Sequence, residues 1–141
     1  MKKLLIPIDG SKSALRALAY ALEETQRYLD VQIHLLNVQA PLLHVWPGKL
    51  VSPDLVRAEL QREGEQLLAD ALSMANAADV RATAHVRMGE PAQEIGACAA
   101  QFGCNAILMG TRGVGVLEGM VMGSVAHKVV HLSPLPVTLV K

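Results

Sequence analysis

The chain has 141 residues, of which 51% are hydrophobic and 18% charged, and its 13 Lys and Arg residues balance 13 Asp and Glu residues. This length fits one domain over residues 1–141, and the composition excludes a chain that is disordered for want of apolar side chains. A neutral chain with one Trp, two Tyr and one Phe also lacks the positive field and the stacking platforms of a nucleic-acid-binding protein.

The amino terminus and the cysteines indicate a cytoplasmic protein. The apolar run that opens the chain stops at Asp9, too early for a signal peptide, and no later stretch approaches the roughly 20 apolar residues of a membrane span. Cys98 and Cys104 lack the Cys-x-x-Cys spacing of a redox motif. We expect both to be small buried hydrophobes in a reducing compartment.

Strand and helix patterns alternate along the whole chain, with continuous apolar runs for the strands and apolar residues at helical spacing for the helices. In chain order the predicted elements are a strand at 3–8, a helix at 11–28, a strand at 31–38, a helix at 52–77, a strand at 80–86, a helix opening at 89–91 and ending near 102, a strand at 106–109, a helix at 124–131 and a strand at 136–140. Ser11 or Ser13 is expected to cap the first helix, and Ser52 with Pro53 opens the second.

Five strands with intervening helices form βαβ units, which predicts an α/β fold with a parallel sheet covered by helices on both faces. Ligands bind such sheets beyond the carboxyl ends of the strands, where the strand order reverses. Asp9 follows the first strand and Gly110 follows the fourth. If these two strands are neighbours, their loops face each other across a crevice, which is the predicted ligand site.

The loop from Gly110 to Ser124 is the most informative segment of the chain. Five glycines fall within it, between a strand and a helix whose first N–H groups form a ready anion site, most naturally for phosphate. A flexible loop that merely caps the helix is the alternative. The loop is not a Walker motif, because no lysine precedes Ser124, and Glu118 stands where a dinucleotide fingerprint would need glycine.

The spacing of Gly110, Gly113, Gly123 and Ser124 matches a Gly-x2-Gly-x9-Gly-Ser pattern without a gap. This pattern resembles the nucleotide-binding signature of the universal stress protein family. The segments 6–11, 89–91 and 136–140 are similar to that family too, so the resemblance covers the whole chain in order. It implies a Rossmann-like, doubly wound five-stranded parallel sheet of order 3-2-1-4-5, and it implies a dimeric protein that binds ATP or a related adenine nucleotide such as AMP or ADP.

The resemblance also implies which residues hold the base and the sugar. Asp9 would accept hydrogen bonds from the ribose hydroxyls, a task that suits a carboxylate because it only accepts. An Asp-Gly turn that caps the first helix is a second interpretation of Asp9, compatible with the first. Pro7, Ile8 and Val38 would flank adenine, with backbone groups reading its edge.

At the phosphate end, Met109 and Gly110 would lie along the ribose and the first phosphate. We expect Arg112, the only cation of the loop, to meet the outer phosphates, although a solvated loop arginine is an equal alternative. Mg²⁺ would accompany a triphosphate. The residues whose backbone N–H groups would cradle the phosphates are Gly113, Gly123, Ser124 and Val125.

The expected function is adenine-nucleotide binding with a regulatory or stress-resistance role. The alternatives are a slow ATP hydrolase, which the missing P-loop lysine and the lack of a clear general base disfavour, and a nucleotide-free protein-interaction module. Glu118 is expected to point away from the phosphates, the alternative being that it helps to hold a divalent ion. His127 and His131 lack an evident third ligand for a metal site. The apolar edge strand 137–140 predicts a two-fold homodimer in which it pairs with its own copy.

Overall fold

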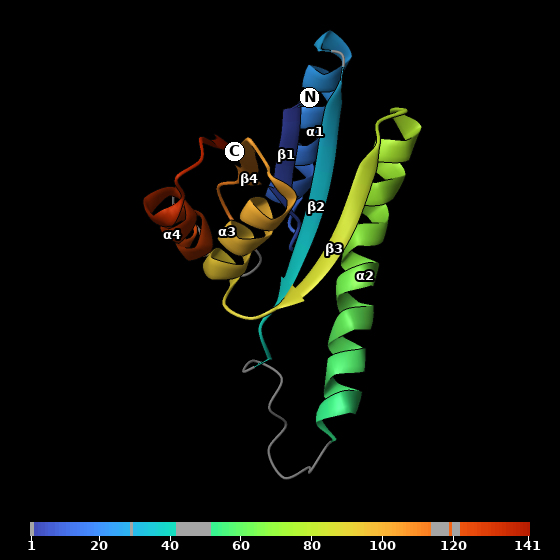
Figure 1. The fold of residues 1–141 in the computed structure, drawn as a ribbon, viewed down its shortest axis with the longest axis vertical. Helices are drawn as coiled ribbons and strands as arrows, with labels where there is room; N and C mark the ends of the chain where they lie inside the picture. Colours follow the sequence, from blue (N-terminus) through green and yellow to red (C-terminus); the bar gives the residue numbers. More distant parts are fainter. Residues whose placement is uncertain (1, 29, 42–51, 114–118, 120–121) are drawn as a thin grey trace.

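The computed structural model describes residues 2–28, 30–41, 52–113, 119 and 122–141. Its five strands form one parallel sheet of order β3-β2-β1-β4-β5, which confirms the predicted fold (Figure 1). The elements in chain order are β1 (Lys2–Pro7), α1 (Lys12–Arg27), β2 (Val31–Gln39), α2 (Pro53–Ala77), β3 (Ala82–Met88), α3 (Pro91–Phe102), β4 (Ala106–Gly110), α4 (Ser124–Leu132) and β5 (Val137–Val140).

The sheet is covered on both faces, as expected for right-handed βαβ crossovers. Side chains of α1 and α2 form one core with residues such as Leu18, Leu35 and Leu68. Side chains of α3 and α4 form the other core, which includes Leu36 and Ile95. Figure 1 shows α2 on one side of the sheet and α3 with α4 on the other. None of the helices in the described part of the chain is long and apolar enough to cross a membrane.

Most predicted boundaries lie within one or two residues of the observed ones, and β3 is displaced most clearly. It begins at Ala82 rather than Val80. The reason is the end of α2, where Asp79 adopts a left-handed conformation with φ 54° and the Val80 N–H donates to the Ala75 carbonyl. Val80 is therefore held by the helix terminus and is not available to the sheet.

Both cysteines are buried and unbridged, as predicted from their spacing. Cys98 lies on α3 and Cys104 lies between α3 and β4, and both pack in the core beneath α3 and α4. Burial raises the pKa of Cys104 to about 11. The thiol therefore stays protonated at neutral pH and behaves as an apolar group.

Two histidines and one phenylalanine form a stacked cluster between the sheet and the end of α3. The Nδ1 of His34 on β2 lies 2.9 Å from the Nε2 of His85 on β3, and both rings stack on Phe102. His34 is only 3% exposed, and its Nε2 has no hydrogen-bond partner among the described residues. Burial and the nearby charge of Lys3 lower the pKa of His34, while burial, His34 and Arg87 lower that of His85.

This cluster predicts that acid destabilises the fold. Both pKa values lie below 6.5 in the folded chain and near 6.5 in the unfolded one. The full stability is therefore present above pH 6.5. It is lost as the pH falls from 6.5 through the folded-state pKa values, by up to about 1.4 kcal/mol per pH unit for each histidine.

Urea denaturation at pH 7.5, 6.5, 5.5 and 5.0 measures the effect, because the carboxyls whose pKa is lowered, such as Glu90, lose their contribution only below about pH 4.5. His34→Leu is expected to flatten the pH dependence, and the exposed His127→Gln on α4 is expected to leave it unchanged. A free energy of unfolding that stays constant from pH 7.5 to 5.0 in the wild type would contradict the prediction.

Candidate ligand-binding site

A cavity of about 350 Å³ lies beyond the carboxyl ends of the central strands. Lys2–Pro7 of β1 pairs with β2 on one side and with β4 on the other, so the strand order reverses at the β1–β4 junction. The cavity is at this reversal, where α/β sheets bind their ligands. All eleven residues that the sequence singles out line it, namely Pro7, Ile8, Asp9, Val38, Met109, Gly110, Arg112, Gly113, Gly123, Ser124 and Val125.

The loops after β1 and β4 face each other across this cavity, as predicted. A Cβ placed on Gly113 would lie only 2.8 Å from the Oδ2 of Asp9, so glycine there makes room for the carboxylate. Asp9 is exposed, and its Oδ1 accepts a hydrogen bond of 2.9 Å from the Ser11 N–H. Asp9 therefore forms the predicted turn, although Ser11 rather than Asp9 caps α1, and the turn aims the carboxyl group toward the loop after β4.

The start of α1 completes this corner of the site. Ser11 is the N-cap, and its hydroxyl oxygen accepts a hydrogen bond from the Ala14 N–H at 3.2 Å. The buried Ser13 contacts the end of β4, where its Oγ is 3.4 Å from the Arg112 N–H that donates to it. These contacts fix the positions of Asp9 and Arg112 relative to one helix.

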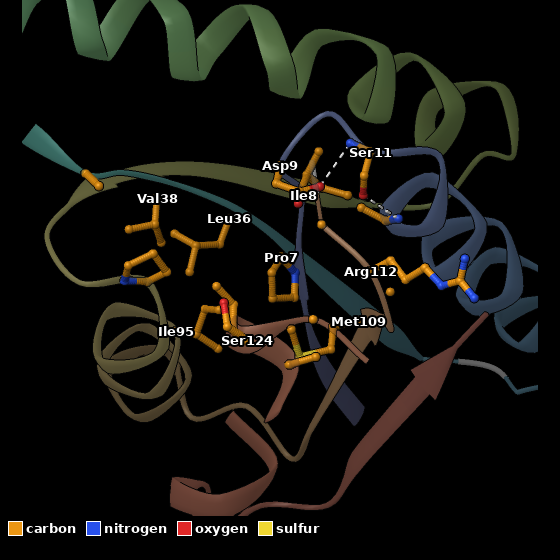
Figure 2. Close-up of a pocket in the computed structure, with 18 of the residues that line it drawn as sticks. Pro7, Ile8, Asp9, Ser11, Leu36, Val38, Ile95, Met109, Arg112 and Ser124 are labelled. Atoms are coloured by element: carbon orange, nitrogen blue, oxygen red, sulfur yellow. Dashed lines mark hydrogen bonds between the residues drawn. The ribbon is translucent and has the colours of Figure 1, made fainter. Parts of the chain in front are cut away.

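One side of the cavity is apolar. Figure 2 shows Pro7 from β1, Leu36 and Val38 from β2, Ile95 from α3 and Met109 from β4 around the same space. Such a wall offers a slot for a flat or apolar group, and it has few polar side chains that could define that group's identity.

The end of β2 leaves one backbone donor and one acceptor at this slot. The Ile8 N–H donates to the Leu36 carbonyl at 2.7 Å, and Ile33 donates to Arg81 on the β3 side, so alternate β2 residues face β1. Val38 therefore turns its N–H and its carbonyl toward β1, which ends at Pro7. Neither group has a backbone partner on that side within the described residues.

A further part of the cavity wall is formed by the start of α4, and Ser124 lies beside Ile95 (Figure 2). Gly123 is the N-cap, and its N–H donates to the Thr111 carbonyl at 2.6 Å, which ties the two ends of the glycine-rich loop together. Ser124, Val125 and Ala126 line the cavity, and the N–H groups of this first turn have no partners within the helix. The helix dipole makes this end attractive to an anion.

Arg112 and Val38 lie at opposite ends of the labelled residues in Figure 2. Arg112 is exposed, with its side chain directed away from the apolar slot. Glu118, predicted to point outward, lies outside the described residues. His127 and His131 are exposed on α4, and no group of three metal-ligating side chains occurs among the residues that the structure describes.

The cavity is also lined by eight residues that the sequence did not identify as part of the site. Leu36 could have been found, because it lies two residues before Val38 and so shares its face of the strand. Gln39 and Ala40 directly follow Val38, and Ser11 and Ala126 are likewise close in sequence to predicted residues. Ala14, Pro91 and Ile95 depend on how α1 and α3 pack against the sheet. The full set is Ser11, Ala14, Leu36, Gln39, Ala40, Pro91, Ile95 and Ala126.

Comparison with known proteins identifies the family. The model of the universal stress protein family matches residues 1–141. The chain is 34% identical to the universal stress protein YxiE of Bacillus subtilis, over 99% of this chain and 98% of that protein. The chain therefore belongs to the universal stress protein family.

Solved structures have the same fold. The hypothetical protein MJ0577 superposes with a TM-score of 0.82 at 24% identity, over 99% of this chain and 95% of that one. A universal stress protein family protein from Arabidopsis thaliana, whose structure has AMP bound, superposes with a TM-score of 0.70 at 22% identity, over 100% of this chain and 92% of that one.

Proposed function

We propose that this chain is a cytoplasmic nucleotide-binding domain, spanning residues 1–141, that binds ATP or another adenine nucleotide and has a regulatory or stress-resistance role. One observation carries the proposal: the eleven residues predicted from the sequence come from four separate segments and all line one cavity. The AMP bound to the Arabidopsis relative supports the same class of ligand.

The apolar slot suits adenine. Pro7 and Met109 provide apolar surface, while the Val38 N–H and carbonyl provide one donor and one acceptor at its edge. Adenine offers the complementary pair, a ring nitrogen that accepts and an exocyclic amine that donates. Guanine offers a protonated ring nitrogen and a carbonyl at the corresponding positions. The Val38 N–H would then face another donor, and the Val38 carbonyl would face another acceptor. The site is therefore expected to prefer adenine over guanine.

The remaining groups follow the nucleotide from sugar to phosphate. Asp9 would accept from the ribose hydroxyls, and the N–H groups of Gly113, Ser124 and Val125 would bind the phosphates. Gly123 would take part only if its N–H left the Thr111 carbonyl, to which it donates in this structure. A triphosphate would bring Mg²⁺ to neutralise its charge.

Isothermal titration of the purified protein with ATP, AMP and GTP tests the proposal. We expect micromolar binding of ATP in the presence of Mg²⁺ and much weaker binding of GTP. Phosphate release measured in the same samples separates stable binding from slow hydrolysis. Titrations without heat for all three nucleotides, together with no nucleotide released from the denatured protein, would contradict the proposal.

Arg112→Ala distinguishes the two interpretations of the loop arginine. If its guanidinium meets the outer phosphates, the variant is expected to bind ATP about tenfold more weakly and AMP unchanged, because AMP lacks those phosphates. The exposed Arg62→Ala on α2 is the matched control. Equal ATP affinity in wild type and Arg112→Ala would identify Arg112 as a solvated surface residue.

We also propose that the protein is a homodimer through β5 (Val137–Val140), which is at the edge of the sheet. The carbonyls of Pro136 and Val140 accept hydrogen bonds from the β4 side, so the backbone groups of Val137 and Leu139 face outward. Pairing of this edge with a second copy would satisfy them. Sedimentation equilibrium measures the oligomeric state. A protein that is still monomeric at roughly 100 µM, where even a weak dimer would form, would contradict the proposed homodimer.

A further inference from the structure

Two buried amide side chains stand at the end of β2. Asn37 is 2% exposed and Gln39 is 7% exposed. The Asn37 Nδ2 donates to the Ile8 carbonyl at 2.8 Å, and the Gln39 Nε2 donates to the Asn37 Oδ1 at 2.8 Å. A backbone carbonyl only accepts, so Ile8 fixes the orientation of the Asn37 amide, and Asn37 in turn fixes that of Gln39.

The Ile8 carbonyl is also the acceptor at which the β1–β2 ladder would continue. The last bond of that ladder runs from the Ile8 N–H to the Leu36 carbonyl. In a parallel ladder the next bond would run from the Val38 N–H to the Ile8 carbonyl. The structure has the Asn37 side chain on that carbonyl instead, and the Val38 N–H makes no backbone bond to it.

We propose that Asn37 is a positioning residue: by occupying the Ile8 carbonyl, its side chain keeps the Val38 N–H available to a ring-nitrogen acceptor of the ligand. The inference rests on the proposed function, because it explains why the Val38 N–H at the adenine slot has no backbone partner within the described part of the chain. Asn37 acts through Val38 and does not itself touch the nucleotide.

The packing around Asn37 fits this assignment. A Cβ placed on Gly64 of α2 would lie 3.0 Å from the Asn37 Oδ1 and 2.6 Å from a methyl of Val86. The helix thus approaches the strand at a glycine, and this leaves room for the amide. Gln39 satisfies the second polar atom of Asn37, so the amide can be buried without an unpaired group.

Amide hydrogen exchange measured by NMR on the ligand-free protein tests the first half of the proposal. In the wild type, the Val38 amide is expected to exchange at least tenfold faster than the Ile8 amide, which is in the ladder. In Asn37→Leu, the Val38 N–H is expected to bond to the released Ile8 carbonyl and to become at least tenfold more protected. Equal protection of Val38 and Ile8 in the wild type would overturn the proposal, whether or not any variant folds.

The variants are chosen to distinguish a specific effect on the Val38 N–H from a general loss of stability. Asn37→Asp preserves the side-chain volume and the acceptor for Gln39 but removes the donor, so it should act like Asn37→Leu if the leucine variant does not fold. Asn105→Leu is the matched control, because the Asn105 Oδ1 accepts from the Lys3 N–H at the opposite end of β1. It is expected to leave the exchange of Val38 unchanged.

Nucleotide titration tests the second half. Asn37→Leu is expected to bind ATP about tenfold more weakly than the wild type, and 1-deaza-ATP, which lacks the ring-nitrogen acceptor, is expected to bind both proteins equally. Equal ATP affinity in the two proteins would overturn the proposal and leave the proposed function standing. If the wild type binds no nucleotide, the proposed function fails. The hydrogen exchange of the Val38 amide then decides by itself whether the Asn37 side chain keeps the Val38 N–H from bonding to the Ile8 carbonyl.

Discussion

Gly110→Ala is expected to lower the free energy of unfolding by about 3 kcal/mol, which corresponds to a fall of about 10 °C in Tm. Gly110 ends β4 where α1 begins to cross the sheet. A Cβ there would lie 2.6 Å from the carbonyl carbon of Ser13 and 2.8 Å from the Ala14 nitrogen. Both atoms belong to the helix backbone, so no side-chain rotation relieves the overlap, and α1 must move away from the strand.

Thermal unfolding followed by circular dichroism measures this effect, and Gly96→Ala is the matched control. Gly96 lies inside α3, and a Cβ placed on it meets nothing within 4 Å. Alanine there is expected to raise stability by about 0.5–1 kcal/mol, because it restricts the unfolded chain and favours the helix. If Gly110→Ala unfolds at the same temperature as the wild type, α1 does not rest directly on the β4 backbone.

Asp9→Asn is expected to weaken ATP binding by about thirty-fold, or about 2 kcal/mol, with little change in Tm. An asparagine retains one oxygen, which can still accept from the Ser11 N–H and hold the turn. Its second atom is a donor, so one ribose hydroxyl loses its acceptor and both lose the charge that strengthens the bond. The loss should therefore appear in binding and not in stability.

Titration with 2′,3′-dideoxy-ATP distinguishes a ribose contact from a general electrostatic effect. An analogue without the hydroxyls is expected to bind wild type and Asp9→Asn with the same affinity, because the interaction under test is absent from both. Asp79→Asn makes the same change of charge at an exposed left-handed position after α2, and it is expected to leave ATP binding unchanged. A thirty-fold loss that persists with the dideoxy analogue would contradict the assigned role of Asp9.

The sequence by itself determined the alternation of strands and helices and the class of sheet. Continuous apolar runs such as residues 3–8 indicate strands buried on both faces, and the observed sheet buries Leu5 and Ile6 completely. Turn and cap chemistry is local as well, so the cap at Ser11 was predictable. The start of β3 was not, because the end of α2 holds Val80 through a hydrogen bond to the Ala75 carbonyl that no periodicity reveals.

The candidate site divides in the same way. The glycine spacing from Gly110 to Ser124 indicated an anion site, because a glycine-rich turn before a helix has a chemical signature of its own. The residues expected to hold the base and the sugar, such as Asp9 and Val38, were implied by the family resemblance. Ile95 and Ala14 line the same cavity without any such signature. They are ordinary helix residues, and only the packing of α3 and α1 against the sheet brings them to it.

Tertiary structure alone decided which backbone groups remain available at the site. The sequence places Val38 at the end of a strand. That its N–H has no backbone partner among the described residues depends on where β1 leaves the ladder and on an Asn37 side chain that reaches across to Ile8. Hydrogen bonds between strands depend on register and on the competition for each carbonyl. Both are properties of chain segments far apart in sequence that meet only in the folded protein.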